Sequence, residues 1–184
     1  MFEVRFHGRG GQGAVTSAEL LALAAIADGK SAQAFPSFGP ERRGAPVIAF
    51  ARVSDAQIRN RTAIQEPSVV VVLDPSLLKL VKVDAGLQPG GTVVVNTSKQ
   101  AAEIRKLSGI KARLATVDAN KIAREEIGRV ITNTTMLGAM LAAVPMVPVA
   151  RIEAALTTRF GRIAGKNINA FRRAQKECAV VEAV

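Results

Sequence analysis

The residues best suited to binding chemistry lie near the N-terminus, in the stretch FHGRGGQGAV at residues 6–15. Gly8, Gly10 and Gly13 match the pattern G-x-G-x-x-G, in which the absence of side chains lets another group approach the backbone closely. The preceding residues alternate like a β-strand, and the following residues carry apolar side chains at helical spacing. A helix that begins at about Gln12 would direct unpaired N–H groups at the turn, so we predict a site for an anion there.

The glycine pattern by itself leaves three interpretations open. A dinucleotide-binding fingerprint also needs an acidic residue at the end of the second strand, where the predicted strand at residues 30–35 offers only Gln33. A P-loop needs Lys and Ser or Thr at the positions that Ala14 and Val15 occupy. Both nucleotide-binding interpretations are weakened by these residues, and the third interpretation is a tight strand-to-helix turn without a ligand.

A proline- and glycine-rich loop, PSFGPERRGAP at residues 36–46, carries the second group of candidate binding residues. Its three prolines restrict the backbone, and Glu41 can help to orient the neighbouring Arg42 and Arg43. Arginine on a rigid loop suits a bidentate contact with a carboxylate or a phosphate. We therefore predict that Arg42 and Arg43 bind either an acidic side chain of a partner or an anionic cofactor.

The chain offers little catalytic machinery: one histidine, His7, one cysteine, Cys178, and neither a G-x-S-x-G nor an H-E-x-x-H motif. His7 stands where the first predicted strand meets the glycine turn, and we expect it to be a strand residue with a satisfied hydrogen bond. One cysteine is too few for an internal disulfide or an iron–sulfur cluster, and we expect Cys178 to pack within an amphipathic C-terminal helix. The sequence therefore predicts no catalytic residue and no metal site on this chain.

Length and composition favour one domain that spans residues 1–184, because 48% of the residues are hydrophobic. The sequence has no run of about 18 apolar residues, and its N-terminus enters a strand with Glu3 and Arg5 in place of a signal peptide. We expect a cytoplasmic protein without membrane contact. The net charge of +10 suits a polyanionic ligand or an acidic partner, whereas the absence of Trp and Tyr argues against nucleic acid.

Strand-like and helix-like segments alternate up to about residue 118, and the remainder of the chain is helical in pattern. A continuous β-branched run such as PSVVVVLDP at residues 67–75 is typical of a strand buried on both faces of a parallel sheet. We predict an α/β fold: a three-layer Rossmann-like domain with a mostly parallel sheet, right-handed crossovers and a helical C-terminal part. Any site is expected at the carboxyl ends of the strands, which hold Gly8–Gly13, the loop at 36–46, Asp74, Asn96 and Asp118.

Three local predictions concern helices. The segment LLKLVKV at residues 77–83 is expected to form a short helix, and the last helix is expected over residues 167–183. Asn133 or Thr134 is expected to cap the helix that follows them, because short polar side chains accept hydrogen bonds from the first N–H groups of a helix.

Nearly the whole chain resembles the gamma subunit of the 2-oxoacid:ferredoxin oxidoreductases. This family comprises pyruvate, ketoisovalerate and 2-oxoglutarate enzymes together with phenylglyoxylate and indolepyruvate enzymes. Six segments carry the resemblance: RFHGRGGQG at 5–13, QAFPSFGPERRGAP at 33–46, VVVLDP at 70–75, VNTSK at 95–99, VDANKIA at 117–123 and NTTMLGA at 133–139. One departure is Thr135, where many relatives have proline; helix capping is not affected by it.

The resemblance implies a multi-subunit enzyme that oxidatively decarboxylates a 2-oxoacid to its acyl-CoA. It implies thiamine diphosphate, iron–sulfur clusters and coenzyme A as cofactors of the complex, with none of them held by this chain alone. It also implies alpha, beta and delta (ferredoxin-like) subunits as partners, and ferredoxin or another acceptor for the electrons. On this basis the isolated chain is expected to be inactive, and its role is to shape the complex.

The candidate cofactor-binding residues are those of the glycine turn and of the arginine pair: Gly8, Arg9, Gly10, Gly11, Gln12, Gly13, Arg42 and Arg43. Two occupants of the glycine turn remain open at this point, an anionic part of coenzyme A and the backbone of a neighbouring chain. The alternative function is a free-standing, Rossmann-like protein that binds a nucleotide or phosphate. The identity of the 2-oxoacid is left open.

Overall fold

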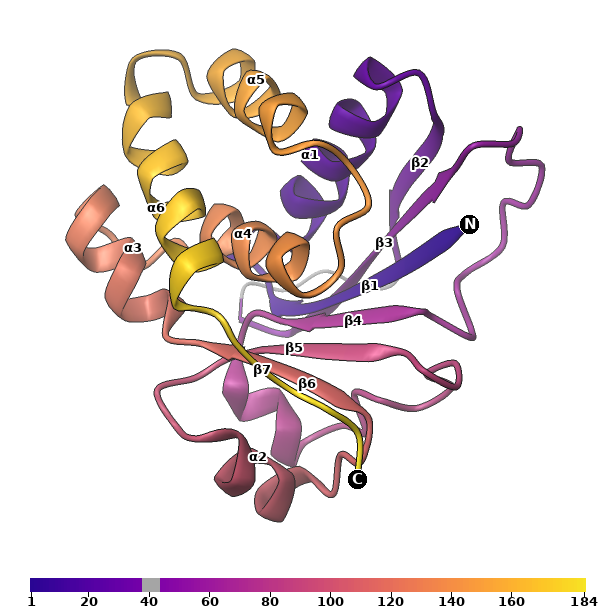
Figure 1. Ribbon diagram of the computed structural model, residues 1–184, viewed down its shortest axis with the longest axis vertical. Coiled ribbons are helices and arrows are strands. Elements are labelled where there is room, and N and C mark those ends of the chain that lie inside the picture. The colour runs from indigo at the N-terminus through magenta and orange to yellow at the C-terminus, as the bar shows by residue number, and fades with distance from the viewer. Residues whose placement is uncertain (38–43) are drawn as a thin grey trace.

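The computed structural model describes residues 1–37 and 44–184, which form a seven-stranded sheet with helices on both faces (Figure 1). The strands are β1 (Phe2–Arg9), β2 (Ser31–Pro36), β3 (Pro46–Ser54), β4 (Val69–Val72), β5 (Thr92–Asn96), β6 (Arg113–Val117) and β7 (Ala179–Val181). The α-helices are α1 (Ala14–Ala27), α2 (Ala101–Ser108), α3 (Ala119–Ile127), α4 (Asn133–Ala143), α5 (Val149–Phe160) and α6 (Ala164–Glu177). Two short 3₁₀ helices are η1 (Pro75–Lys79) and η2 (Gly161–Ile163).

The strands lie in the order β2-β3-β1-β4-β5-β6-β7. The pairs β1–β4, β4–β5 and β5–β6 are parallel, whereas β3 runs antiparallel to both of its neighbours and β7 runs antiparallel to β6. Every strand except β3 and β7 therefore points in one direction. The prediction of an α/β fold with a mostly parallel sheet is confirmed.

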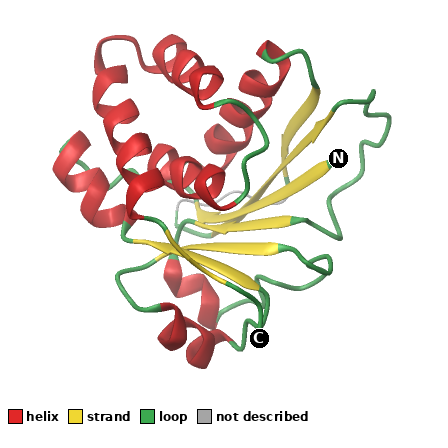
Figure 2. Cartoon of the chain, in the orientation of Figure 1, coloured by secondary structure: helices red, strands yellow, loops and turns green. Residues whose placement is uncertain are grey.

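Helices cover the sheet from two sides, which gives the three predicted layers (Figure 2). On one face, α1, α4 and α6 pack over a large core that includes Phe6, Leu21 and Phe171. On the other face, η1 and α2 cover a smaller core on β4, β5 and β6. The valines of β4 are buried on both faces, as expected of a central strand in a parallel sheet.

The predicted crossovers do not extend to β2 and β3, because these two strands pair antiparallel and their connection is not a crossover. Residues 37–45 connect them, and this connection is shorter than the dozen or so residues that a parallel crossover needs. The antiparallel strand β3 consequently lies between β2 and the strand that carries the glycine turn.

Two helix predictions also need correction. The predicted helix at 77–83 is the 3₁₀ helix η1, which begins earlier because Asp74 caps it through the N–H of Ser76 and Pro75 opens it. The last helix ends at Glu177, not at residue 183, and Ala179–Val181 pair with β6 as an edge strand. Cys178 therefore follows α6 and does not lie within it.

No helix in the described ranges is long and apolar enough to cross a membrane.

Candidate functional site

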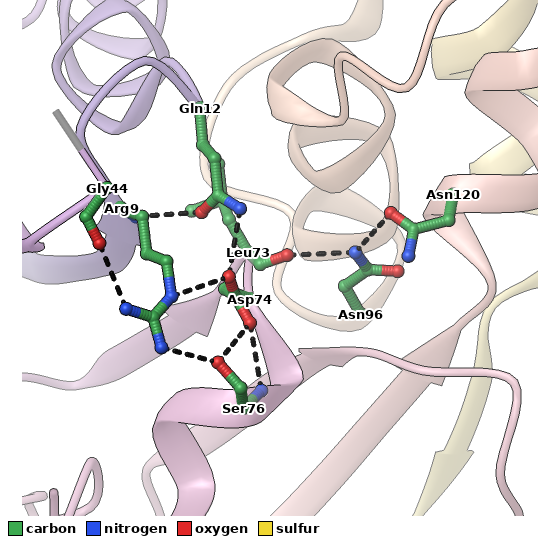
Figure 3. A network of polar contacts seen from close by, with 8 residues as sticks. All are labelled: Arg9, Gln12, Gly44, Leu73, Asp74, Ser76, Asn96 and Asn120. Atoms are coloured by element: carbon green, nitrogen blue, oxygen red, sulfur yellow. Dashed lines mark hydrogen bonds and ion pairs between the residues drawn. The ribbon is translucent and has the colours of Figure 1, made fainter. Parts of the chain in front are cut away.

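The carboxyl ends of β1, β4 and β5 bring residues far apart in the sequence to one edge of the sheet (Figure 3). Here Asn96 is used for structure: its Nδ2 donates to Leu73 O at 2.8 Å and its Oδ1 accepts from the Ala119 N–H at 3.0 Å. Asp118 caps α3 by accepting from the Lys121 N–H at 2.9 Å. Asn96 and Asp118 are therefore occupied in structural hydrogen bonds. The glycine turn lies at the same edge of the sheet and borders a pocket.

The glycine turn joins β1 to α1 in a backbone conformation that favours glycine. Gly11 and Gly13 have φ of 92° and 81°, in the left-handed region, whereas Gly10 does not. Helix α1 begins at Ala14, two residues later than predicted, and its first hydrogen bond runs from the Ser17 N–H to Gly13 O at 2.9 Å. The helix therefore leaves the N–H groups of residues 14–16 without an intrahelical acceptor, at its positive end.

Arg9 and Gln12 tie the turn to the end of β4. The Arg9 N–H donates to Gln12 Oε1 at 2.7 Å, and Gln12 Nε2 donates to Asp74 Oδ2 at 3.0 Å. The Arg9 guanidinium forms an ion pair with Asp74 at 3.0 Å and donates to Ser76 Oγ at 2.8 Å and to Gly44 O at 2.9 Å. These contacts, visible in Figure 3, hold the turn in one conformation.

Asp74 is the centre of this network and stays ionised. Partial burial alone would raise its pKa, but hydrogen bonds from Ser76 and Gln12, together with the charge of Arg9, hold the pKa below its ordinary value. The carboxylate consequently remains an acceptor for Arg9 and Gln12 at neutral pH.

A pocket of about 280 Å³ opens at the turn. It is lined by the end of β1, the turn, the first residues of α1 and one residue of β3: Arg9, Gly10, Gly11, Gly13, Ala14, Val15, Thr16 and Val47. An added Cβ at Gly11 would meet no atom within 4 Å, so this glycine borders open space. Unpaired N–H groups at a helix N-terminus beside a glycine turn suit a phosphate or another anion.

Of the predicted binding residues, Gly8 and Arg9 end β1, and Gly10, Gly11, Gln12 and Gly13 form the turn before α1. Arg42 and Arg43 lie outside the described residues, although Gly44 and Ala45, at the end of the same loop, contact the turn: the Gly10 N–H donates to Ala45 O at 3.0 Å. Asp74 was predicted only as a strand-end residue and not as the partner of Arg9, and Ser76 was not predicted to take part. The only local signal was the sequence Asp-Pro-Ser after a buried strand.

Asn133 is a further residue at the turn whose role differs from the prediction. Thr132 occupies the N-cap position without a side-chain capping bond, and Asn133 is the first residue of α4. The Asn133 side chain packs against Gly13, so that an added Cβ at Gly13 would lie 2.9 Å from Nδ2 and 3.0 Å from Cβ of Asn133. The capping prediction is therefore wrong, and the N-termini of α1 and α4 are packed together.

His7 and Cys178 have the environments of structural residues. His7 is buried and accepts a hydrogen bond from Arg5 Nε at 3.1 Å, which confirms the expected hydrogen bond. Burial and the charge of Arg5 lower the pKa of His7 to about 4, and burial raises the pKa of the Cys178 thiol to about 11. In the described part of the chain, no three His, Cys, Asp or Glu residues are placed to hold a metal ion.

The sheet order speaks against a dinucleotide site. In the dinucleotide fold the second strand lies next to the strand that ends in the glycine turn, whereas here β3 intervenes and Gln33 of β2 pairs with Arg52 of β3. Gln33, the candidate for a ribose contact, is thus separated by the whole of β3 from the strand that leads into the turn.

Comparison with known proteins decides the family. Residues 3–177 match the family described as pyruvate ferredoxin/flavodoxin oxidoreductase. The chain belongs to this pyruvate ferredoxin/flavodoxin oxidoreductase family. It is 54% identical to the pyruvate/ketoisovalerate oxidoreductases common subunit gamma of Thermococcus litoralis, over 99% of this chain and 100% of that one. It is 47% identical to pyruvate synthase subunit PorC of Methanothermobacter thermautotrophicus, over 96% of each chain.

Among solved structures, pyruvate oxidoreductase subunit PORC of Thermotoga maritima matches this member of the family with a TM-score of 0.89 and 40% identity, over 98% of both chains. The keto/oxoacid ferredoxin oxidoreductase gamma subunit of Geobacter sulfurreducens matches with a TM-score of 0.76 and 27% identity, over 96% of this chain and 98% of that one. The resemblance found in the sequence is confirmed: the chain is the gamma subunit of a pyruvate or 2-oxoacid ferredoxin oxidoreductase complex, with other subunits as its partners.

Proposed function

We propose that this gamma subunit supplies an anion-binding turn to a cytoplasmic complex that oxidatively decarboxylates a 2-oxoacid to its acyl-CoA, and that the turn binds a phosphate of coenzyme A. The observation that carries the proposal is the pocket at residues 9–16, where a rigid glycine turn meets the unpaired N–H groups of α1. Coenzyme A supplies the thiol that accepts the acyl group.

The residues of the turn fit such a group by their donors and their shape. The N–H groups of Ala14, Val15 and Thr16 lie at the positive end of a 14-residue helix, and Gly11 leaves space in front of them. Asp74 fixes Arg9 and Gln12, so little conformational freedom is lost when an anion binds. The binding role predicted for Arg42 and Arg43 remains a prediction.

The other cofactors belong to partner chains in this proposal. A four-cysteine cluster site cannot be formed by a chain with a single cysteine, so iron–sulfur clusters are assigned to other subunits. Thiamine diphosphate is assigned likewise to partners of alpha and beta type, and a delta, ferredoxin-like subunit passes the electrons on to ferredoxin or another acceptor. The family membership and the full-length similarity to gamma subunits support this assignment over a free-standing nucleotide-binding protein.

Replacing Gly11 with alanine is expected to raise the KM for coenzyme A at least about tenfold in the reconstituted complex, with kcat changed less than about threefold. The added methyl group enters the pocket in front of the α1 N-terminus, and a loss of about 1.4 kcal/mol in binding corresponds to that factor. The measurement is 2-oxoacid-dependent reduction of a viologen dye at varied coenzyme A.

Gly29→Ala is the matched control, because Gly29 also has a positive φ, of 81°, and also borders open space, but lies at the far end of α1. Both variants carry a similar backbone strain, and only Gly11→Ala changes the pocket. An unchanged KM for coenzyme A in Gly11→Ala, with weakened binding to the other subunits, would show that a partner's backbone occupies the turn and would refute the coenzyme A site.

A further inference from the structure

A second pocket, of about 240 Å³, lies beside β1. Arg5 and His7 alternate along β1 with the core residues Val4 and Phe6, so their side chains lie on the opposite face of the sheet. Both line this pocket together with Lys82, and its apolar wall includes Val47, Ile48 and Val81. Three basic side chains thus border a small, largely apolar space.

Arg5 carries a buried charge that the described part of the chain does not pair with a carboxylate. Arg5 is only 9% exposed, and its Nη2 donates to Val83 O at 2.8 Å and to Ala85 O at 2.6 Å. Its Nε donates to His7 Nε2 at 3.1 Å, and the two N–H groups of Nη1, which have no acceptor among the described residues, are accessible to water and not buried. Asp84 acts on Arg5 through its charge without forming an ion pair with it.

The hydrogen bond from Arg5 also determines which ring nitrogen of neutral His7 carries the proton. Because Nε2 accepts from Arg5, the proton of the neutral ring is on Nδ1, and that N–H, which has no acceptor in the described ranges, is likewise accessible to water. A buried guanidinium is stabilised best by an opposite charge with good hydrogen-bond geometry. The space is smaller than the roughly 300–1,000 Å³ of sites for drug-sized ligands, so it suits one small group.

We propose that this pocket binds a single carboxylate carried on a small apolar body, with Arg5 Nη1 as the principal donor. Val47, Ile48 and Val81 contact the apolar body, and Lys82 adds positive charge at the opening. The inference does not depend on the proposed coenzyme A site. Such a carboxylate comes either from a free small acid or from an acidic side chain of another subunit, and two measurements distinguish these sources.

The first measurement uses the full chain alone, because His7 is its only histidine and gives one set of imidazole NMR resonances. Isobutyrate is titrated in, with isobutyramide as a neutral probe of the same shape. If the source is a free acid, isobutyrate shifts the His7 resonances saturably and isobutyramide does not. Arg5→Gln should then weaken binding at least about tenfold, whereas Arg105→Gln, at an arginine that also donates to backbone carbonyls, should change it less than twofold.

The second measurement compares the affinity of the same variants for the remaining subunits of the complex. If the source is a partner's acidic side chain, Arg5→Gln weakens assembly at least about tenfold, isobutyrate competes with assembly, and Arg105→Gln assembles normally. The inference is overturned if the wild-type chain shows no saturable difference between isobutyrate and isobutyramide and isobutyrate does not weaken assembly. Both of these tests use the wild-type chain, so they remain decisive if Arg5→Gln does not fold.

Discussion

Replacing Glu3 with alanine is expected to lower the free energy of unfolding by about 3–5 kcal/mol. Glu3 accepts a hydrogen bond from Arg52 Nε at 2.7 Å, and the Arg52 side chain is only 1% exposed. Without Glu3 the guanidinium keeps its bonds to the carbonyls of Asn60 and Thr62 but loses its counter-charge inside the protein. Urea unfolding of the two proteins, followed by circular dichroism, measures the difference.

The control for Glu3 is Asp55, whose ion pair with Lys30 lies at the surface. The Asp55 side chain is 90% exposed and the Lys30 side chain 25%. Water and salt screen such a pair, so Asp55→Ala is expected to cost no more than about 1 kcal/mol. A cost for Glu3→Ala equally small would mean that Arg52 is solvated when Glu3 is absent, contrary to its burial.

The second large effect is expected at Gly13. Gly13→Ala should destabilise the chain by about 2–5 kcal/mol, since about 1–2 kcal/mol of left-handed backbone strain is joined by about 1–3 kcal/mol of overpacking. The added Cβ would lie 3.0 Å from Cβ and 3.1 Å from Cγ of Asn133, which α4 holds in place. Gly29→Ala has the same φ of 81° and no neighbour within 4 Å, so it should show the strain alone.

A double-mutant cycle isolates the contact between Gly13 and Asn133. Asn133→Ala removes Nδ2 and Cγ, two of the three atoms that crowd the new Cβ, and keeps the contact with the Cβ of residue 133. The double variant should therefore be less destabilised than the sum of the single variants, by about 1 kcal/mol. Additive effects, or equal losses for Gly13→Ala and Gly29→Ala, would contradict the close packing of α1 against α4.

The sequence predicted those parts of the fold whose signal is local. The valines of residues 69–72 form an uninterrupted β-branched run, and such a run is buried in the centre of a parallel sheet whatever its neighbours are. The strand Ala179–Val181 was not predicted, because three apolar residues directly after a helix favour its continuation. They form a strand only because they pair with β6. The antiparallel direction of β3 likewise depends on how the chain returns to the sheet.

Only the part of the candidate site that has a local sequence signal was predicted. The glycine pattern at residues 8–13 lies in one continuous stretch, so the turn was found from the sequence. The Arg9–Asp74 ion pair joins residues 65 positions apart, and it forms because β4 pairs with β1, which no local pattern reveals. The contact of Asn133 with Gly13 depends on the packing of α4 against α1, so the sequence suggested only a helix cap for Asn133.

Reconstitution of the complex tests most directly whether this chain acts only as a subunit. Three samples are assayed for 2-oxoacid- and coenzyme A-dependent reduction of a viologen dye. They are this chain alone, the other subunits alone, and the other subunits with this chain added. We expect no turnover by the chain alone, little or none by the other subunits without it, and full turnover when the chain is added back. Turnover by this chain alone, or an undiminished rate in its absence, would show that the chain is not a required subunit.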